Sequence, residues 1–278
     1  KEIPMPVIDF HIHVAQPEHY HPWVIEWMQS VTEHMSIEKA RKMLTPEGIQ
    51  HVLQEAGIDY AVALAEISPI STGVTTSDYV ADLCRGIECL IPFASINPFM
   101  TGDLAKELKR CVNELGCRGL KMYPTYQHFY PNDARVYPLY AQAQEMGIPI
   151  MFHTGSSVFR GSRMKYGDPL FLDDVAVDFP DLVILAVHSG RGFWYDRAAL
   201  LARLHPNLYM EISGLPPKKL LTYFPELERL ADKVIFGSDW PGVPDLKGNI
   251  ETIRALPISE EAKEKILGGN AARILGLE

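Results

Sequence analysis

Short runs of apolar and β-branched residues recur along the chain, and longer stretches with helical signals separate them. The first run, Val7-Ile8-Asp9-Phe10-His11-Ile12-His13, has the length and composition of a β-strand. Strands that alternate with helices pair in parallel through right-handed crossovers, so the pattern predicts an α/β fold with a parallel sheet. Eight strands are expected, at residues 7–13, 59–65, 90–97, 117–123, 149–154, 182–188, 208–213 and 234–239.

Helix signals fill the stretches between these runs. Thr45-Pro46-Glu47 supplies an N-cap, a proline at the first helical position and an acid in the first turn, and Gly57 supplies the stop. Gly116 and Gly147 also stand where C-terminal caps are expected. Further helices are predicted near residues 76–88, 102–115, 133–146, 170–179, 193–204, 217–231, 246–255 and 259–267.

Eight strand and helix units in about 250 residues describe a (β/α)₈ TIM barrel. The alternative is an open doubly wound sheet, which normally carries a Gly-rich phosphate loop after its first strand. His11-Ile12-His13-Val14-Ala15-Gln16-Pro17 occupies that place instead. The connection at 14–58 is too long for a minimal crossover. We therefore expect an insertion there that either covers the barrel mouth or packs against the barrel side.

Composition and charge narrow the class of protein. Of the 278 residues, 47% are hydrophobic and 22% are charged, which is typical of a globular domain with a large core. The net charge of −9 argues against a nucleic-acid partner, which usually needs a basic face. No apolar run approaches the roughly 18 residues that cross a bilayer, and no signal-peptide pattern precedes the first strand. We therefore expect a cytoplasmic protein without a membrane partner.

His11 and His13 are the most informative polar residues of the chain. Side chains at i and i+2 of a strand point the same way, so both imidazoles can reach one metal ion. Asp9 is expected to share their face, and Phe10 and Ile12 are expected to lie under the helices. An isolated His-x-His is more often only the polar end of a strand.

Polar residues at other strand ends change that interpretation. His153, His188 and Asp239 close the predicted strands 149–154, 182–188 and 234–239. Catalytic groups of a TIM barrel come from the C-terminal ends of its strands. Imidazole and carboxylate are also typical ligands of divalent transition metals, so the sequence predicts a metal site at the barrel mouth. The four cysteines have no Cys-x-x-Cys spacing, so no cysteine zinc site is expected.

These segments resemble the amidohydrolase superfamily, in particular the amidohydrolase-related branch that includes aminocarboxymuconate semialdehyde decarboxylase. The resemblance covers nearly the whole chain, and its specificity lies in the order and spacing of the motifs. It implies a single metal-dependent hydrolase TIM-barrel domain over residues 1–278. The motifs are Val7 to His13, Gly119-Leu120-Lys121 before Tyr123-Pro124, Phe152-His153-Thr154-Gly155, His188-Ser189-Gly190, Phe236-Gly237-Ser238-Asp239-Trp240-Pro241 and Gly269-Asn270-Ala271-Ala272-Arg273-Ile274-Leu275-Gly276.

The resemblance implies roles for these residues. His11, His13 and His153 would bind one divalent ion, expected to be Zn²⁺, with Asp239 as the fourth protein ligand. His188 would polarise the substrate or transfer a proton, and Asp239 would also accept a proton from the metal-activated water. In binuclear relatives a strand-4 lysine is carboxylated and bridges two metals. Lys121 is therefore expected either to carry a carboxyl group beside a second metal or to bind a substrate carboxylate.

Residues just past the strand ends are candidates for substrate contacts. Arginines there would suit a small, carboxylated substrate through bidentate hydrogen bonds. Glu211 and Ser213 are expected to face the barrel interior, where Glu211 would orient a ligand or pair with Lys121. Besides Lys121, the candidate substrate-binding residues are Tyr123, His128, Arg160, Arg163, Arg191 and Trp240, with Asn97 as a weaker candidate.

The leading functional prediction is a metal-dependent hydrolase that uses activated water on a small-molecule amide, lactone or related carbonyl. The first alternative is a non-oxidative decarboxylase, or a hydratase, of a small unsaturated or aromatic carboxylic acid. A metal-dependent phosphoesterase and a non-catalytic metal-binding barrel are the remaining alternatives. Relatives are often dimers, so a homodimer is the expected assembly.

Overall fold

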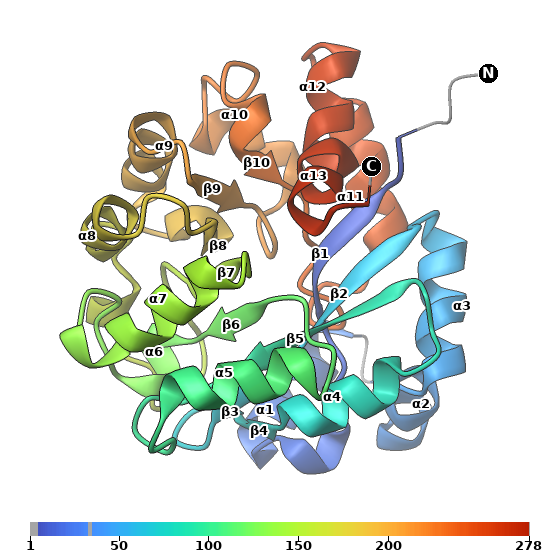
Figure 1. Ribbon diagram of the computed structural model, residues 1–278. Helices are drawn as coiled ribbons and strands as arrows, with labels where there is room; N and C mark the ends of the chain where they lie inside the picture. Colours follow the sequence, from blue (N-terminus) through green and yellow to red (C-terminus); the bar gives the residue numbers. More distant parts are fainter. Residues whose placement is uncertain (1–4, 33–34, 278) are drawn as a thin grey trace.

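Eight parallel strands form a nearly closed barrel surrounded by helices, as the sequence predicts (Figure 1). The computed structural model describes residues 5–32 and 35–277. Each observed strand lies within its predicted range and is shorter than it, because the ends of the apolar runs continue into loops. In sheet order the strands are β1 (Ile8–His13), β2 (Tyr60–Leu64), β5 (Leu90–Ser95), β6 (Leu120–Met122), β7 (Ile150–His153), β8 (Ile184–Val187), β9 (Leu208–Glu211) and β10 (Val234–Ile235).

The seam between the last strand and the first is closed by the chain that follows β10. The backbone N–H of Phe10 donates to the carbonyl of Phe236 at 3.0 Å, and that of His13 donates to Trp240 at 2.7 Å. The N–H of Asp239 donates in turn to the carbonyl of His11 at 3.0 Å. These bonds place Asp239 beside the two histidines of β1.

A one-residue irregularity in β1 corrects the predicted faces of that strand. Asp9 pairs with Ala61 and Ile12 with Ala63, so β1 takes three steps where β2 takes two. The extra residue turns Phe10 into the barrel interior, where its ring lies 5.6 Å from that of Phe93. Ile12 packs outward under the helices as expected. Asp9 does not share the cavity face: its Oδ1 accepts the N–H groups of Ser238 and His11 at 2.9 and 3.1 Å.

The helices of the barrel wall begin and end near their predicted positions. Thr45 caps α3 (Pro46–Ala56) through its hydroxyl, and Gly57 ends it with φ of 71°. Gly116 and Gly147 also have left-handed φ, at 75° and 64°. The other wall helices are α4 (Ser77–Cys84), α5 (Leu104–Asn113), α7 (Tyr137–Glu145), α8 (Phe171–Asp178), α9 (Tyr195–Leu204), α11 (Leu246–Arg254), α12 (Glu260–Glu264) and α13 (Asn270–Leu275).

Two predicted helices differ in the structure. The stretch 217–231 contains only the short helix α10 (Leu220–Tyr223) between 3₁₀ turns, because Pro225 cannot continue a helix and restricts Phe224 before it. The helix predicted at 259–267 continues from α12 through a π turn (Lys265–Gly269) into α13. The barrel is closed underneath by α13, whose Ala271 and Leu275 pack against the interior core.

Elements outside the barrel cover its mouth. The insertion after β1 forms α1 (Pro22–Val31) and α2 (Ile37–Met43), and a hairpin of β3 (Glu66–Ser68) and β4 (Gly73–Thr75) follows β2. The hairpin was not predicted. We call α1 and this hairpin (66–75) the roof; they lie together in Figure 1. They are joined by the Trp23 indole N–H, which donates to the Ser71 carbonyl at 2.8 Å.

Between residues 5–32 and 35–277, no helix is long and apolar enough to cross a membrane.

Candidate metal centre

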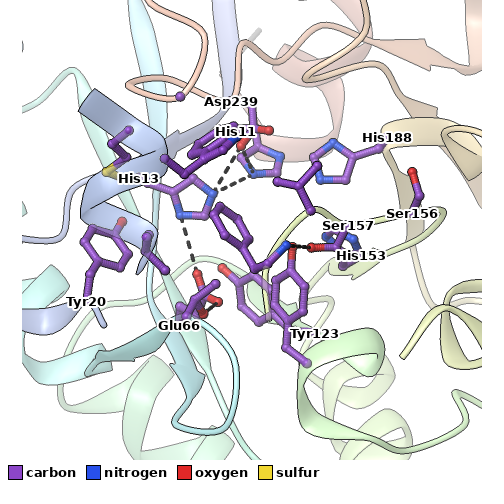
Figure 2. Close-up of a pocket in the computed structure, with 18 of the residues that line it drawn as sticks. His11, His13, Tyr20, Glu66, Tyr123, His153, Ser156, Ser157, His188 and Asp239 are labelled. Carbon is purple, nitrogen blue, oxygen red and sulfur yellow. Dashed lines mark hydrogen bonds and ion pairs between the residues drawn. The ribbon is translucent and has the colours of Figure 1, made fainter. Parts of the chain in front are cut away.

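Three donor atoms from β1 and the seam converge at the barrel mouth (Figure 2). His11 Nε2 lies 3.2 Å from His13 Nε2, and Asp239 Oδ1 lies 3.5 and 3.3 Å from these two nitrogens. The i and i+2 spacing thus brings both imidazoles to one point, as predicted. Two imidazoles and a carboxylate are a donor set that fits a divalent transition metal.

His153, at the end of β7, offers a fourth candidate donor atom. Its side chain is buried, its ring lies 4.7 Å from that of His188, and its Nε2 has no hydrogen-bond partner among the described residues. A buried polar atom without a partner is costly unless a ligand satisfies it. Burial and the nearby Arg191 charge hold the pKa of His153 well below its usual value, so the imidazole is neutral. This orphaned nitrogen fits the role of a metal ligand.

The backbone at two of the strand ends is unusual. Asp239 and His188 have φ of 72° and 60°, a left-handed conformation that few non-glycine residues adopt. Such conformations cost about 1–3 kcal/mol each and persist where the surrounding structure enforces them, often at functional sites. Here they turn the two side chains into the cavity that they line.

Ser213 and Glu211 fix the orientation of two of the histidines. His11 Nδ1 lies 2.8 Å from Ser213 Oγ, and that hydroxyl donates to Glu211 Oε2 at 2.8 Å. His188 Nδ1 lies 2.8 Å from the Ser213 carbonyl, which can only accept, so Nδ1 carries the proton. The Nε2 atom of His188 is therefore the acceptor in the neutral ring. Glu211 and Ser213 lie inside the barrel, as predicted.

Lys121 lies at the base of the same site. It is fully buried, and its Nζ has no hydrogen-bond partner in the described part of the chain. Burial lowers the pKa of Lys121 to about 8, and burial raises the pKa of Glu211 to about 7. The predicted pairing of these two groups is only a through-space attraction, since no ion pair joins them among the described residues.

Arg191 brings a second cation to the site. Its Nη1 lies 3.8 Å from Asp239 Oδ2, and its Nη2 donates to the Ser156 carbonyl at 3.1 Å. Burial alone would raise the pKa of Asp239, but the hydrogen bond from His13 and the nearby positive charges hold it below its usual value. Gly214, with φ of 65°, leaves room for this pair, because a Cβ there would lie 2.6 Å from Arg191 Nη1.

A cavity of about 270 Å³ beneath the roof is lined by the four histidines, Lys121, Arg191 and Asp239. The insertion covers the barrel mouth, since Tyr20, Val24, Trp27 and Met28 all line this cavity. Trp27 contacts Phe159, with their ring centroids 5.0 Å apart. Aromatic walls and a few convergent polar groups are typical of a small-molecule site.

Not every predicted contact residue reaches the cavity. Lys121, Tyr123 and Arg191 line it, but His128, Arg160 and Trp240 do not. His128 faces outward, with its Nε2 2.6 Å from the Gly161 carbonyl, and the exposed Arg160 lies over the ring of Trp23. Trp240 is buried in the core under the helices. Position just past a strand end does not fix side-chain direction, because the loop can turn the residue either way.

Asn97 and Arg163 do not line the cavity either. Asn97 instead donates its side-chain N–H to the carbonyl of Ile67 in the hairpin, at 3.0 Å. Arg163 is exposed.

Glu66 is the main cavity residue that the sequence reasoning missed. Its side chain is buried and lines the cavity, and burial raises its pKa. The available signal was an acid directly after the apolar run 59–65, at a predicted strand end. Tyr20, Trp27 and Thr72 were also missed as cavity residues, because their approach depends on the tertiary path of the insertion and the hairpin.

Comparisons with known proteins show the family of the chain. The family model described as "Amidohydrolase" matches residues 8–277. The gamma-resorcylate decarboxylase of Rhizobium sp. (strain MTP-10005) is 23% identical over 91% of each chain. The 2-keto-4-carboxy-3-hexenedioate hydratase of Sphingobium sp. (strain NBRC 103272 / SYK-6) is 27% identical, covering 67% of this chain and 64% of its own.

Two solved structures share the fold over nearly the whole chain. An uncharacterised TIM-barrel protein from Bordetella bronchiseptica has a TM-score of 0.80 and 26% identity, covering 98% of this chain and 99% of its own. A dihydroxybenzoic acid decarboxylase from Polaromonas sp. JS666, with bound manganese and the inhibitor 2-nitroresorcinol, has a TM-score of 0.72 and 18% identity. It covers 98% of this chain and 97% of its own.

Proposed function

Because the chain belongs to the amidohydrolase family, we propose that it is a metal-dependent carboxy-lyase that removes carbon dioxide from a small unsaturated or aromatic acid. The sequence placed hydrolysis first and decarboxylation second. The decarboxylase and hydratase relatives support the second interpretation over the first. The observation that carries the proposal is the unpartnered, buried ammonium of Lys121 in the same cavity as the metal-ligand cluster.

The charges of the cavity favour an anionic substrate. Lys121 and Arg191 both line it, and Lys121 has no counter-ion in contact within the described residues. A substrate carboxylate would supply the missing acceptor, and charge-assisted hydrogen bonds of this kind are among the strongest. The rings of Tyr123, Tyr126, Trp27 and Phe159 offer flat apolar walls for an aromatic or conjugated body.

His11, His13, His153 and Asp239 are the proposed ligands of one divalent ion. Once bound, this ion would polarise a substrate oxygen as a Lewis acid. Manganese in the Polaromonas relative supports a divalent metal without favouring the zinc expected from the sequence. Ser213 and Glu211 keep the proton of His11 on Nδ1, so its Nε2 lone pair faces the cluster.

His188 and Asp239 are the proposed proton-transferring groups. Decarboxylation breaks the bond between the carboxylate carbon and its neighbour, releases carbon dioxide, and leaves an electron pair that must take up a proton. His188 holds its Nδ1–H on the Ser213 carbonyl, so Nε2 is the atom that gains and delivers a proton. Arg191 lies beside Asp239 and would keep that carboxylate oriented toward the substrate.

The test is product analysis on a panel of hydroxybenzoates and small unsaturated dicarboxylates, with Mn²⁺ or Zn²⁺ supplied to chelator-treated protein. We expect carbon dioxide release and a product lighter by one carboxyl group. Gain of one water without carbon dioxide would support the hydratase alternative that the Sphingobium relative favours. Hydrolysis of an amide or lactone, with no activity on the acids, would contradict the proposal. The single domain, homodimer and cytoplasmic location stay predictions.

A further inference from the structure

We propose that Glu66 is a positioning residue for His13, delivered by a hairpin that lies outside the barrel. In this role its carboxylate faces the second ring nitrogen of His13, which holds the proton there and leaves Nε2 free for the ligand cluster. The inference rests on the proposed metal site, and it assigns a second supporting carboxylate to that site.

The geometry places Glu66 behind His13. Its Oε2 lies 3.9 Å from His13 Nδ1, while His13 Nε2 lies 3.3 Å from Asp239 Oδ1 on the other side of the ring (Figure 2). The other oxygen, Oε1, accepts the hydroxyl of Thr72 from the same hairpin. At 3.9 Å this contact is longer than a hydrogen bond, and the proposal requires His13 Nδ1–H to donate to Oε2 once the metal is bound. Hydrogen bonds of this kind are often long in an empty site and tighten when it is loaded.

The two histidines of the pair are supported in parallel ways. His11 Nδ1 contacts Ser213 Oγ, and Glu211 accepts from that hydroxyl. Among the residues the structure describes, Glu66 is the carboxylate that lies at the corresponding nitrogen of His13. A ligating imidazole usually donates its other N–H to a carboxylate, carbonyl or water, which fixes its tautomer and ring orientation. Glu66 gives His13 the partner that Glu211 and Ser213 give His11.

The backbone on both sides of Glu66 is held by side chains from other loops. The Tyr123 hydroxyl donates to the carbonyl of Ala65 at 3.0 Å. The side-chain amides of Asn97 and Gln127 both donate to the carbonyl of Ile67, each at 3.0 Å. All three of these side chains are buried.

This support is more than a simple cover needs. A hairpin that only closed the barrel mouth would require no fixed position for one acidic side chain. Groups that must hold a functional geometry within about half an ångström are typically fixed by such surrounding hydrogen bonds. Asn97, predicted from the sequence as a substrate contact, thus acts on the hairpin that carries Glu66 instead, and Tyr123 both lines the cavity and acts on the hairpin.

The test compares metal affinity in Glu66→Gln, Glu66→Asp and the parent protein. Binding of Mn²⁺ and of Zn²⁺ is measured by competition with a chelator, and unfolding of the metal-free proteins is measured by heat. We expect Glu66→Gln to bind each metal on the order of 10- to 100-fold more weakly. Glu66→Asp keeps the charge but shortens the side chain, so we expect an intermediate affinity. Glu114→Gln, an exposed matched change, should bind as the parent does.

A further variant separates positioning from a merely structural role. Thr72→Val removes the hydroxyl that donates to Glu66 Oε1 but leaves the carboxylate facing His13. We therefore expect a lower unfolding temperature and only a small change in metal affinity. Parental affinity in Glu66→Gln would overturn the inference, as would a parent that binds neither metal. Affinity is measured without substrate, so failure to release carbon dioxide would count against the proposed lyase and leave this result standing.

Discussion

The barrel mouth and the roof above it are built in different ways. His11, His13, His153, His188 and Asp239 come from strand ends, and the parallel register of the barrel brings them together. The roof is held by side-chain contacts with backbone carbonyls, such as His21 Nε2 at 2.8 Å from the Pro69 carbonyl. The strand ends thus supply the proposed metal-binding and proton-transferring groups, and roof residues line the cavity above them. If these roles are right, substitutions at the strand ends should change metal content and rate, and substitutions in the roof should change substrate preference.

Removal of a proposed metal ligand at the barrel mouth should have the largest effect. His153→Ala deletes a buried nitrogen that has no protein partner among the described residues, so we expect loss of bound metal and activity at background level. Metal content by mass spectrometry and carbon dioxide release measure the two effects. The matched control is His128→Ala, whose imidazole faces the Gly161 carbonyl outside the cavity. Equal metal content in both variants would contradict the ligand assignment.

Loss of the cavity arginine should have the next largest effect. Arg191→Gln removes a charged donor from the cavity, worth about 1.5–3 kcal/mol, which corresponds to a fall in kcat/KM on the order of 10- to 100-fold. Steady-state kinetics on the best substrate acid measure this effect, and we expect most of it in KM. Arg160→Gln serves as the control, because that guanidinium lies outside the cavity. A similar loss in both variants would show that overall charge, and not contact, attracts the substrate.

A pair of glycine substitutions tests how closely the site is packed. Gly214→Ala places a Cβ 2.6 Å from Arg191 Nη1 at a φ of 65°, whereas Gly86→Ala has a φ of 77° and open space around it. Both should destabilise the fold by about 1 kcal/mol or more, because both force a left-handed side chain. Only Gly214→Ala should also raise KM, by displacing Arg191. Urea unfolding and kinetics of the two variants together measure the difference; equal kinetics would argue that Arg191 tolerates displacement.

A substitution in the roof should have the smallest effect on activity, and it should change the preference between small and large substrate acids. Trp27→Leu removes the ring that contacts Phe159 above the cavity. We expect bound metal to be unchanged and larger substituted acids to be accepted several-fold better relative to the parent substrate, about 1 kcal/mol of discrimination. The ratio of kcat/KM values for a small and a large acid measures it. Loss of metal in this variant would contradict the separate roles proposed for the roof and the barrel mouth.

The barrel and its polar strand ends were predictable because two simple rules govern them. Alternation along a strand places His11 and His13 on one side, and parallel strands put their C-terminal ends at one mouth. Those two rules were enough to predict that His153, His188 and Asp239 lie near His11 and His13. They needed no knowledge of the loops.

The remaining features depend on contacts that are distant in sequence. The irregularity in β1 reversed the expected faces of Asp9 and Phe10, and only the pairing with β2 reveals it. In the sequence, Glu66 looks like the continuation of strand 59–65. The hairpin that turns it toward His13 is held by Tyr123, Asn97 and Gln127, which are distant in sequence, so its direction could not be predicted. His128 and Arg160 follow strand ends as the cavity residues Tyr123 and Arg191 do, but their side chains turn away from the cavity.

The barrel seam has a consequence for stability. His11 and His13 belong to the first strand and Asp239 to the segment that follows the last strand, and three backbone hydrogen bonds join these segments. An ion shared by the three side chains would crosslink the two ends of the sheet, so the free metal concentration would set how firmly the barrel closes. At a hundredfold excess over Kd such binding adds about 2.7 kcal/mol to the free energy of unfolding. Chelation should then speed hydrogen exchange at the amides of Phe10, His13 and Asp239 before it affects those between β7 and β8.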